Sequence, residues 1–181
     1  MLNSTLEKGD HLITSSYEHP AVLKVANSLE LKGVDVTYIA PNKNGIIELK
    51  NIEDAINKNT KLISIMYVNN ELGTINPLKE ISKLCKQKNI LFHTDAVQYI
   101  GKLPFNLSEY SIDFLSLAAH KFYGPKSIGA LYMANGNTIN PLFIGGGQEK
   151  GIRPGTENIA LIAGMSKALE ISYNSMDKNI A

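Results

Sequence analysis

A lysine that follows an apolar stretch offers the most reactive chemistry in the sequence. Lys121 comes just after the strand-like run 113–118 and directly before 122–125, a rigid and largely apolar turn. A lysine beside a histidine and apolar groups loses its proton more readily, and its amine can then form a Schiff base with a carbonyl compound. The alternative is an ordinary surface lysine, which is the commonest fate of this residue type.

A carboxylate in the preceding strand-like segment could complete this chemistry. Asp95 follows the run 90–94. A Schiff base of a heterocyclic aldehyde needs an acidic partner for the ring nitrogen, and Asp95 is the natural candidate. Its spacing is equally compatible with a carboxylate that caps the backbone of the segment after it.

Further polar side chains follow the other apolar runs. They include two histidines, three amides and three carboxylates, namely Glu18, His19, Asn69, Asn70, Glu71, Asp95, Gln98 and His120. Gln98 and Asn70 could hydrogen-bond the phenolic oxygen of a cofactor ring, or they could cap loops. His19 could stack on an aromatic ring and move protons, or it could bond to the backbone at the start of a helix.

The segments that must position these residues alternate between two periodicities. Apolar, β-branched-rich runs predict strands at 11–15, 34–39, 62–68, 90–94, 113–118 and 128–133, and helical spacing predicts helices at 21–32, 49–57, 77–88 and 158–173. This order predicts an α/β fold with a mainly parallel sheet and helices on both of its faces. Ligands bind such sheets beyond the carboxyl ends of the strands, where the polar residues fall.

Composition narrows the class of protein. The 181 residues carry a formal net charge of +1, are 44% hydrophobic and contain one cysteine. We therefore expect one globular domain, no nucleic-acid or membrane partner and no intramolecular disulfide. Residues 1–10 contain no apolar run, so no secretory signal is expected, and a cytoplasmic location follows. No metal site is expected. Cys85, His11 and His93 fall on apolar faces or in strands and are interpreted as structural.

A glycine-rich segment precedes the last predicted helix. It spans 145–158 and contains Arg153 and Thr156. A helix that starts after a glycine run can hold phosphate through its backbone N–H groups, and Arg153 would add a positive charge. The start at 156–158 is typical of a helix cap.

Taken together, these motifs resemble those of one enzyme family. The matching segments are SYEHPAVL, VTYIAPNKNGIIEL, SIMYVNNELGTI, HTDAVQYIGKLP, AAHKFYGPKSIGALY and GGGQEKGIRPGTEN. They resemble the cysteine desulfurases of iron–sulfur cluster assembly, which are class V aminotransferase-like, fold-type I enzymes dependent on pyridoxal 5'-phosphate (PLP). The resemblance implies conversion of L-cysteine to L-alanine, with the sulfur passed on as an enzyme-bound persulfide.

The resemblance also implies roles for single residues. Lys121 would hold the cofactor as a Schiff base, and Asp95 would pair with the ring nitrogen. Gln98 and Asn70 would contact the phenolic oxygen, and His19 would stack on the ring and transfer protons. The phosphate would be bound by His120 and, from the neighbouring subunit of a homodimer, by Thr156. Ala118 stands where the family commonly has a serine that binds this phosphate.

The resemblance covers the middle of the family's pattern. On this basis we expect residues 1–181 to be part of the large PLP-binding domain, truncated, without the N-terminal arm and without the C-terminal small domain that carries the catalytic cysteine. Such a fragment is expected to be inactive alone, because desulfuration needs that thiolate. An iron–sulfur scaffold or another sulfur acceptor would be the partner. The alternatives are another class V enzyme, such as a selenocysteine lyase or an aminotransferase, and a non-catalytic remnant that binds a full-length desulfurase.

Overall fold

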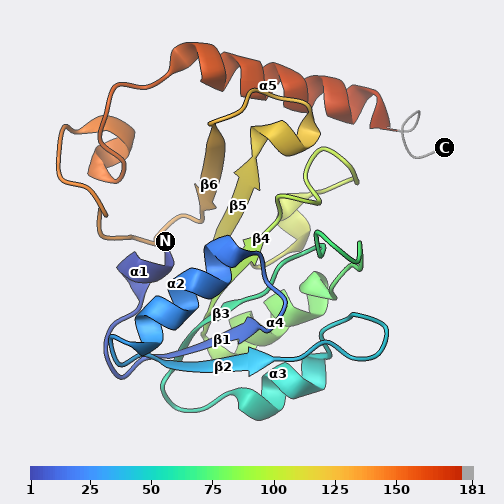
Figure 1. Ribbon diagram of the computed structural model, residues 1–181, viewed down its shortest axis with the longest axis vertical. Helices are drawn as coiled ribbons and strands as arrows, with labels where there is room; N and C mark the ends of the chain where they lie inside the picture. The colour runs from blue at the N-terminus through green and yellow to red at the C-terminus, as the bar shows by residue number, and fades with distance from the viewer. Residues whose placement is uncertain (177–181) are drawn as a thin grey trace.

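A six-stranded sheet forms the centre of the computed structural model, which describes residues 1–176 (Figure 1). The strand order is β2-β1-β3-β4-β5-β6. The strands are β1 His11–Ser15, β2 Asp35–Ile39, β3 Thr60–Ser64, β4 Leu91–Asp95, β5 Phe114–Ala118 and β6 Gly129–Met133. Strands β1 to β5 run parallel, and β6 pairs antiparallel with β5 at one edge. The predicted mainly parallel α/β fold is confirmed.

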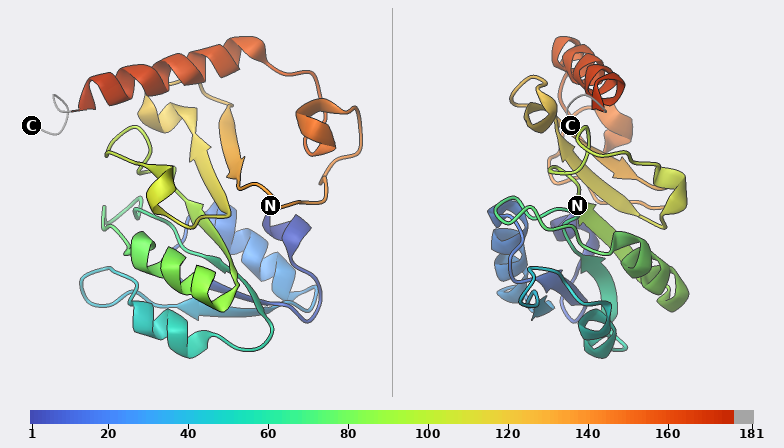
Figure 2. Two further views of the ribbon diagram at one scale, coloured as in Figure 1. Left: turned by 180° about the vertical axis from the view of Figure 1, so that it is seen from behind. Right: turned by 90° about the vertical axis from the view of Figure 1, so that its right-hand side faces the viewer.

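Helices cover both faces of the sheet, as the sequence pattern predicts (Figures 1 and 2). Helices α1 Leu2–Thr5 and α2 Pro20–Glu30 lie on one face, and α3 Leu49–Ala55 and α4 Leu78–Lys88 lie on the other. Each face has its own cluster of buried apolar side chains. Strand β1 is buried along its whole length because it is covered on both sides, which explains its apolar sequence.

The last helix lies across the carboxyl end of β5 (Figure 1). Helix α5 spans Ile159–Asn174 and contacts the short 3-10 helix η2, Ala119–Phe122. Asn158 caps α5, since its side-chain oxygen accepts a hydrogen bond from the Leu161 N–H at 3.1 Å. The predicted helix start is therefore confirmed. No helix in residues 1–176 combines the length and hydropathy that a bilayer crossing needs.

The predicted strand 62–68 is wrong in its boundaries. The observed strand β3 is Thr60–Ser64, although residues 65–67 are buried and apolar. Two side chains hydrogen-bond the backbone of Met66. Its N–H donates to Glu18 Oε1 and its carbonyl accepts from Asn76 Nδ2, both at 2.8 Å. These groups are not available to β1, so the regular strand ends there. The Ile65 and Tyr67 N–H groups still donate to the His93 and Asp95 carbonyls of β4, at 3.2 and 2.9 Å.

Short elements were not predicted. These are α1 and the 3-10 helices η1 Leu107–Glu109, η2 Ala119–Phe122 and η3 Gln148–Gly151. Elements of three or four residues contain about one turn, so hydrophobic periodicity cannot reveal them. Two of them matter for function, because α1 and η2 contribute side chains to the main cavity.

Candidate active site

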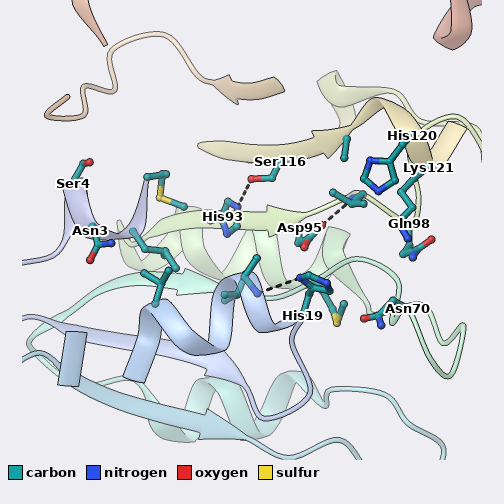
Figure 3. A pocket seen from close by; sticks show the side chains of 18 of the residues that line it. Asn3, Ser4, His19, Asn70, His93, Asp95, Gln98, Ser116, His120 and Lys121 are labelled. Carbon is teal, nitrogen blue, oxygen red and sulfur yellow. Dashed lines mark hydrogen bonds between the residues drawn. The ribbon is translucent and has the colours of Figure 1, made fainter. Parts of the chain in front are cut away.

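A cavity of about 620 Å³ lies on the α2 face of the sheet, at the carboxyl ends of the central strands (Figure 3). The sequence-predicted residues that line it are His19, Asn70, Asp95, Gln98, His120 and Lys121. They come from four separate segments, which the parallel strands bring to one edge. These six residues bring an amine, a carboxylate, two amides and two imidazoles to the cavity.

Asp95 ends strand β4 and provides the negative charge of the cavity. Its Oδ1 accepts a hydrogen bond from the Val97 N–H at 2.9 Å, so the backbone contact considered as an alternative is also present. Burial raises the pKa of the Asp95 carboxyl, while the Val97 N–H and nearby His19 act in the opposite direction. A cationic nitrogen brought into the cavity would therefore find a carboxylate that has little solvent to compete with it.

Lys121 and His120 lie on η2, immediately after β5. Phe122, which is 1% exposed, anchors this turn in the core, and Lys121 itself is exposed toward the cavity. The turn ends at Tyr123, whose φ of 62° is left-handed. Gly124 follows because a Cβ there would lie 2.9 Å from the Ala119 carbonyl oxygen. The tight turn thus explains the glycine and aims the two polar side chains at the cavity.

His19 is the N-cap of α2. Its Nδ1 accepts a hydrogen bond from the Ala21 N–H at 3.2 Å, and Pro20 occupies the first helical position. Because Nδ1 serves as the acceptor, Nε2 carries the proton of the neutral ring. His19 therefore bonds to the backbone through Nδ1 and also lines the cavity.

Glu18, next to His19, is a buried acid that ties two strands together. Its Oε1 accepts hydrogen bonds from Ser15 Oγ at 2.5 Å and from the Met66 N–H at 2.8 Å, and the side chain is 3% exposed. Burial raises its pKa to about 8, with the charge of Asp95 contributing in the same direction. Glu18 therefore holds the start of α2, and with it His19, against the segment after β3.

This raised pKa predicts how stability depends on pH. The folded protein holds the Glu18 proton up to about pH 8, whereas the unfolded chain releases it near pH 4.5, the ordinary pKa of a glutamate side chain. Between these values the folded state binds more protons, so the unfolding free energy falls as pH rises, by up to about 1.4 kcal/mol per pH unit. Glu18→Gln should flatten this slope, measured by urea unfolding at several pH values. Equal slopes for both proteins would contradict the assignment.

The two amides of the cavity are oriented by their neighbours. Lys102 Nζ donates to Gln98 Oε1 at 2.5 Å, which leaves the amide hydrogens of Gln98 free to bind an acceptor. Burial, followed by the nearby charge of Lys121, lowers the pKa of Lys102. Asn70 follows Asn69, whose side-chain oxygen accepts from the Glu71 and Leu72 N–H groups and so shapes the loop. Asn69 itself is buried in that loop rather than in the cavity.

Some cavity residues were not predicted as site residues. Asn3 and Ser4 of α1, Ser116 of β5 and His93 of β4 also line it (Figure 3). Strand alternation could have indicated His93, because residues two apart in a strand share a face and Asp95 is in the candidate site. The sequence interprets His93 as structural, and the residue is 4% exposed.

Thr156 lies outside this cavity. It is exposed in the segment between η3 and α5, as is most of the glycine-rich stretch. Gln148 Oε1 accepts from the Gly155 N–H at 3.1 Å and closes this stretch into a loop. In residues 1–176 no group of three or more His, Cys, Asp or Glu side chains is arranged to hold a metal ion.

Comparison with known proteins identifies the class. Residues 1–181 match the family described as Aminotransferase class-V, and the chain belongs to this family. The chain is 50% identical over 173 residues to the cysteine desulfurase IscS of Dictyoglomus turgidum, covering 96% of this chain and 44% of that protein.

Solved structures agree with this relationship. One described as SspA in complex with cysteine has 48% identity and a TM-score of 0.87, covering 89% of this chain and 47% of its own. A NifS-like protein has 42% identity and a TM-score of 0.90, covering 93% and 47%. The chain therefore spans about half the length of the relatives that it matches.

Proposed function

We propose that residues 1–181 form part of the PLP-binding large domain of a cysteine desulfurase. The complete enzyme would convert L-cysteine to L-alanine and pass the sulfur, as a persulfide, toward iron–sulfur cluster assembly. The observation that carries this proposal is the shared cavity of Lys121 and Asp95 at the carboxyl edge of the sheet. The similarity to a protein named cysteine desulfurase IscS supports the choice of reaction, and the similarity to SspA, solved in complex with cysteine, supports the choice of substrate.

The donor set of the cavity fits PLP. The Lys121 amine would bind its aldehyde, and the Asp95 carboxylate would accept a hydrogen bond from the ring nitrogen. When bound, the cofactor supplies an electron sink for bonds to the substrate's α-carbon. The Gln98 amide, oriented by Lys102, would donate to the phenolic oxygen together with Asn70. His19 would lie against the ring and move protons through Nε2, because its Nδ1 is held by the backbone.

The phosphate would lie near His120, on the η2 turn. Ala118 lines the cavity nearby and offers no hydroxyl, so one hydrogen bond commonly made in the family is missing. Thr156 would bind the phosphate of a neighbouring subunit, which agrees with its exposure outside its own cavity. A homodimer would also cover apolar side chains that are exposed near this loop, among them Phe143 and Ile159, at 58% and 76% exposure.

The thiol that accepts sulfur is not Cys85. This cysteine, the only one in the sequence, lies on α4 with its side chain in the core, 1% exposed. Burial raises the pKa of its thiol to about 12, so almost none of it is the thiolate that attacks sulfur. We therefore propose that the accepting thiolate comes from outside residues 1–181. An iron–sulfur scaffold or another sulfur acceptor would receive the persulfide sulfur.

A titration tests the proposal. PLP added to the purified chain should give the visible band of a lysine-bound cofactor, and L-cysteine should change this band more than equimolar L-serine does. Alanine should not accumulate from the chain alone, because its one thiol is buried. A folded chain that gives no band would contradict the proposal. Accumulation of a keto acid without sulfur release would instead favour an aminotransferase.

A further inference from the structure

A line of hydrogen bonds crosses three strands beneath the cavity. His93 Nδ1 lies 2.8 Å from Ser64 Oγ. His93 Nε2 lies 3.0 Å from Ser116 Oγ, the contact that Figure 3 draws. The strands β3, β4 and β5 each supply one of these residues. The parallel register places Ser64 opposite His93, and Ser116 opposite Asp95. We call these three residues the serine–histidine bridge.

The imidazole of this bridge is uncharged. Both ring nitrogens face hydroxyl groups, which can donate or accept, so a neutral ring satisfies both hydrogen bonds. His93 is 4% exposed, and within residues 1–176 its hydrogen-bond partners include no carboxylate. Burial lowers its pKa to about 3. The bridge therefore adds hydrogen bonds to the cavity floor without adding charge.

The position of the bridge relates it to Asp95. His93 and Asp95 are two residues apart on β4, so their side chains lie on the same face, about 7 Å apart along the strand. Among the described residues, no lysine or arginine forms an ion pair with Asp95. A positive charge at position 93 would attract the Asp95 carboxylate and weaken its interaction with a cationic ligand. The neutral imidazole does not compete in this way.

We propose that His93 is a positioning residue for Asp95. Through Ser64 and Ser116 it fixes the spacing of β3, β4 and β5 at the cavity floor, and as an uncharged bridge it leaves the Asp95 carboxylate to the protonated ring nitrogen of PLP. This inference rests on the proposed function, because it assumes that PLP is the ligand. It assigns a role to a histidine whose hydrogen bonds go to Ser64 and Ser116, and not to Lys121 or Asp95, the two residues proposed to hold the cofactor.

The chain contains a matched control for this role. His11 is also a buried strand histidine, at 1% exposure, and its nitrogens lie 2.7 Å from Thr60 Oγ1 and 2.9 Å from Thr37 Oγ1. Asn57 Nδ2 also lies 3.0 Å from His11 Nδ1. His11 lies at the amino end of β1, at the opposite edge of the sheet from the cavity. Replacing His11 therefore measures the general cost of losing a buried imidazole that is hydrogen-bonded at both ring nitrogens.

The experiment compares PLP binding by His93→Leu, His93→Gln, Ser116→Ala and His11→Leu. Circular dichroism confirms folding, and visible absorbance gives both the dissociation constant and the position of the cofactor band. His93→Leu should weaken PLP binding about tenfold or more and shift the band, since it leaves two hydroxyls unpaired beside Asp95. His93→Gln should bind within about threefold of wild type because an amide can restore the bonds, and Ser116→Ala should fall between them. His11→Leu should leave both readouts unchanged.

Specific results would overturn the inference. One is a folded His93→Leu protein with the wild-type dissociation constant and band. Another is an equal loss in His11→Leu, which would reduce the effect to general destabilisation. If His93→Leu does not fold, the same decision rests on Ser116→Ala, where wild-type binding and an unshifted band would overturn the inference. A wild-type chain that is folded but binds no PLP would contradict the proposed function first, and the inference with it.

Discussion

Replacing Lys121 with alanine is expected to abolish the visible band that the chain forms with PLP. The amine of Lys121 lines the cavity that also contains Asp95, and it is the group proposed to hold the cofactor covalently. The side chain is exposed, so its loss leaves the core unchanged and the circular dichroism spectrum should match that of wild type. Absorbance after PLP titration measures the effect directly.

Lys102 provides the matched control for this substitution. It is a second lysine close to the cavity, where it bonds Gln98, and the charge of Lys121 contributes to lowering its pKa. Lys102→Ala should keep the band and change only the affinity, because Gln98 loses the donor that orients it. If the band survives in Lys121→Ala and disappears in Lys102→Ala, Lys102 and not Lys121 holds the cofactor, and the assignment is wrong.

Replacing Asp95 with asparagine is the second change with a large expected effect. The amide keeps an oxygen that can accept the Val97 N–H, so the local backbone contact is retained. The negative charge is lost, and with it a charge-assisted hydrogen bond to the ring nitrogen worth about 1.5–3 kcal/mol. PLP affinity should therefore fall about tenfold to a hundredfold, measured by absorbance titration.

Asp113→Asn controls for the loss of a half-buried, hydrogen-bonded carboxylate elsewhere. Asp113 accepts hydrogen bonds from the Phe92 N–H and from Asn137 Nδ2, both at 2.9 Å, at the amino end of β5. This variant should lower stability but leave PLP affinity unchanged. If Asp95→Asn binds PLP as tightly as wild type does, or if Asp113→Asn weakens binding equally, Asp95 does not bind the ring nitrogen.

Much of the fold could be predicted from local patterns. Strand β1 lies at His11–Ser15 as predicted, because its apolar run is bounded by residues that break strands. The boundary of β3 could not be predicted, because it depends on Glu18 and Asn76, two side chains distant in the sequence that bond to the backbone of Met66. Tertiary hydrogen bonds of this kind leave no periodic signal in the segment that they terminate.

The candidate site was partly predictable for a geometric reason. Parallel strands end at one edge, so residues that follow strands meet there, and Lys121 and Asp95 do so. The contribution of α1 could not be predicted, because Asn3 and Ser4 belong to one short turn without a pattern. The bridge from Ser64 through His93 to Ser116 was also missed, since it depends on the register between strands, which a single sequence does not specify.

The central claim is that Lys121 holds the cofactor that Asp95 binds through its ring nitrogen. Borohydride reduction of the PLP-loaded chain, followed by peptide mapping by mass spectrometry, tests it most directly, because reduction makes the lysine–cofactor bond permanent. We expect one modified lysine, Lys121, with less label at this position in Asp95→Asn at limiting PLP. Label on Lys102 or spread over surface lysines, with Lys121 unmodified, would contradict it.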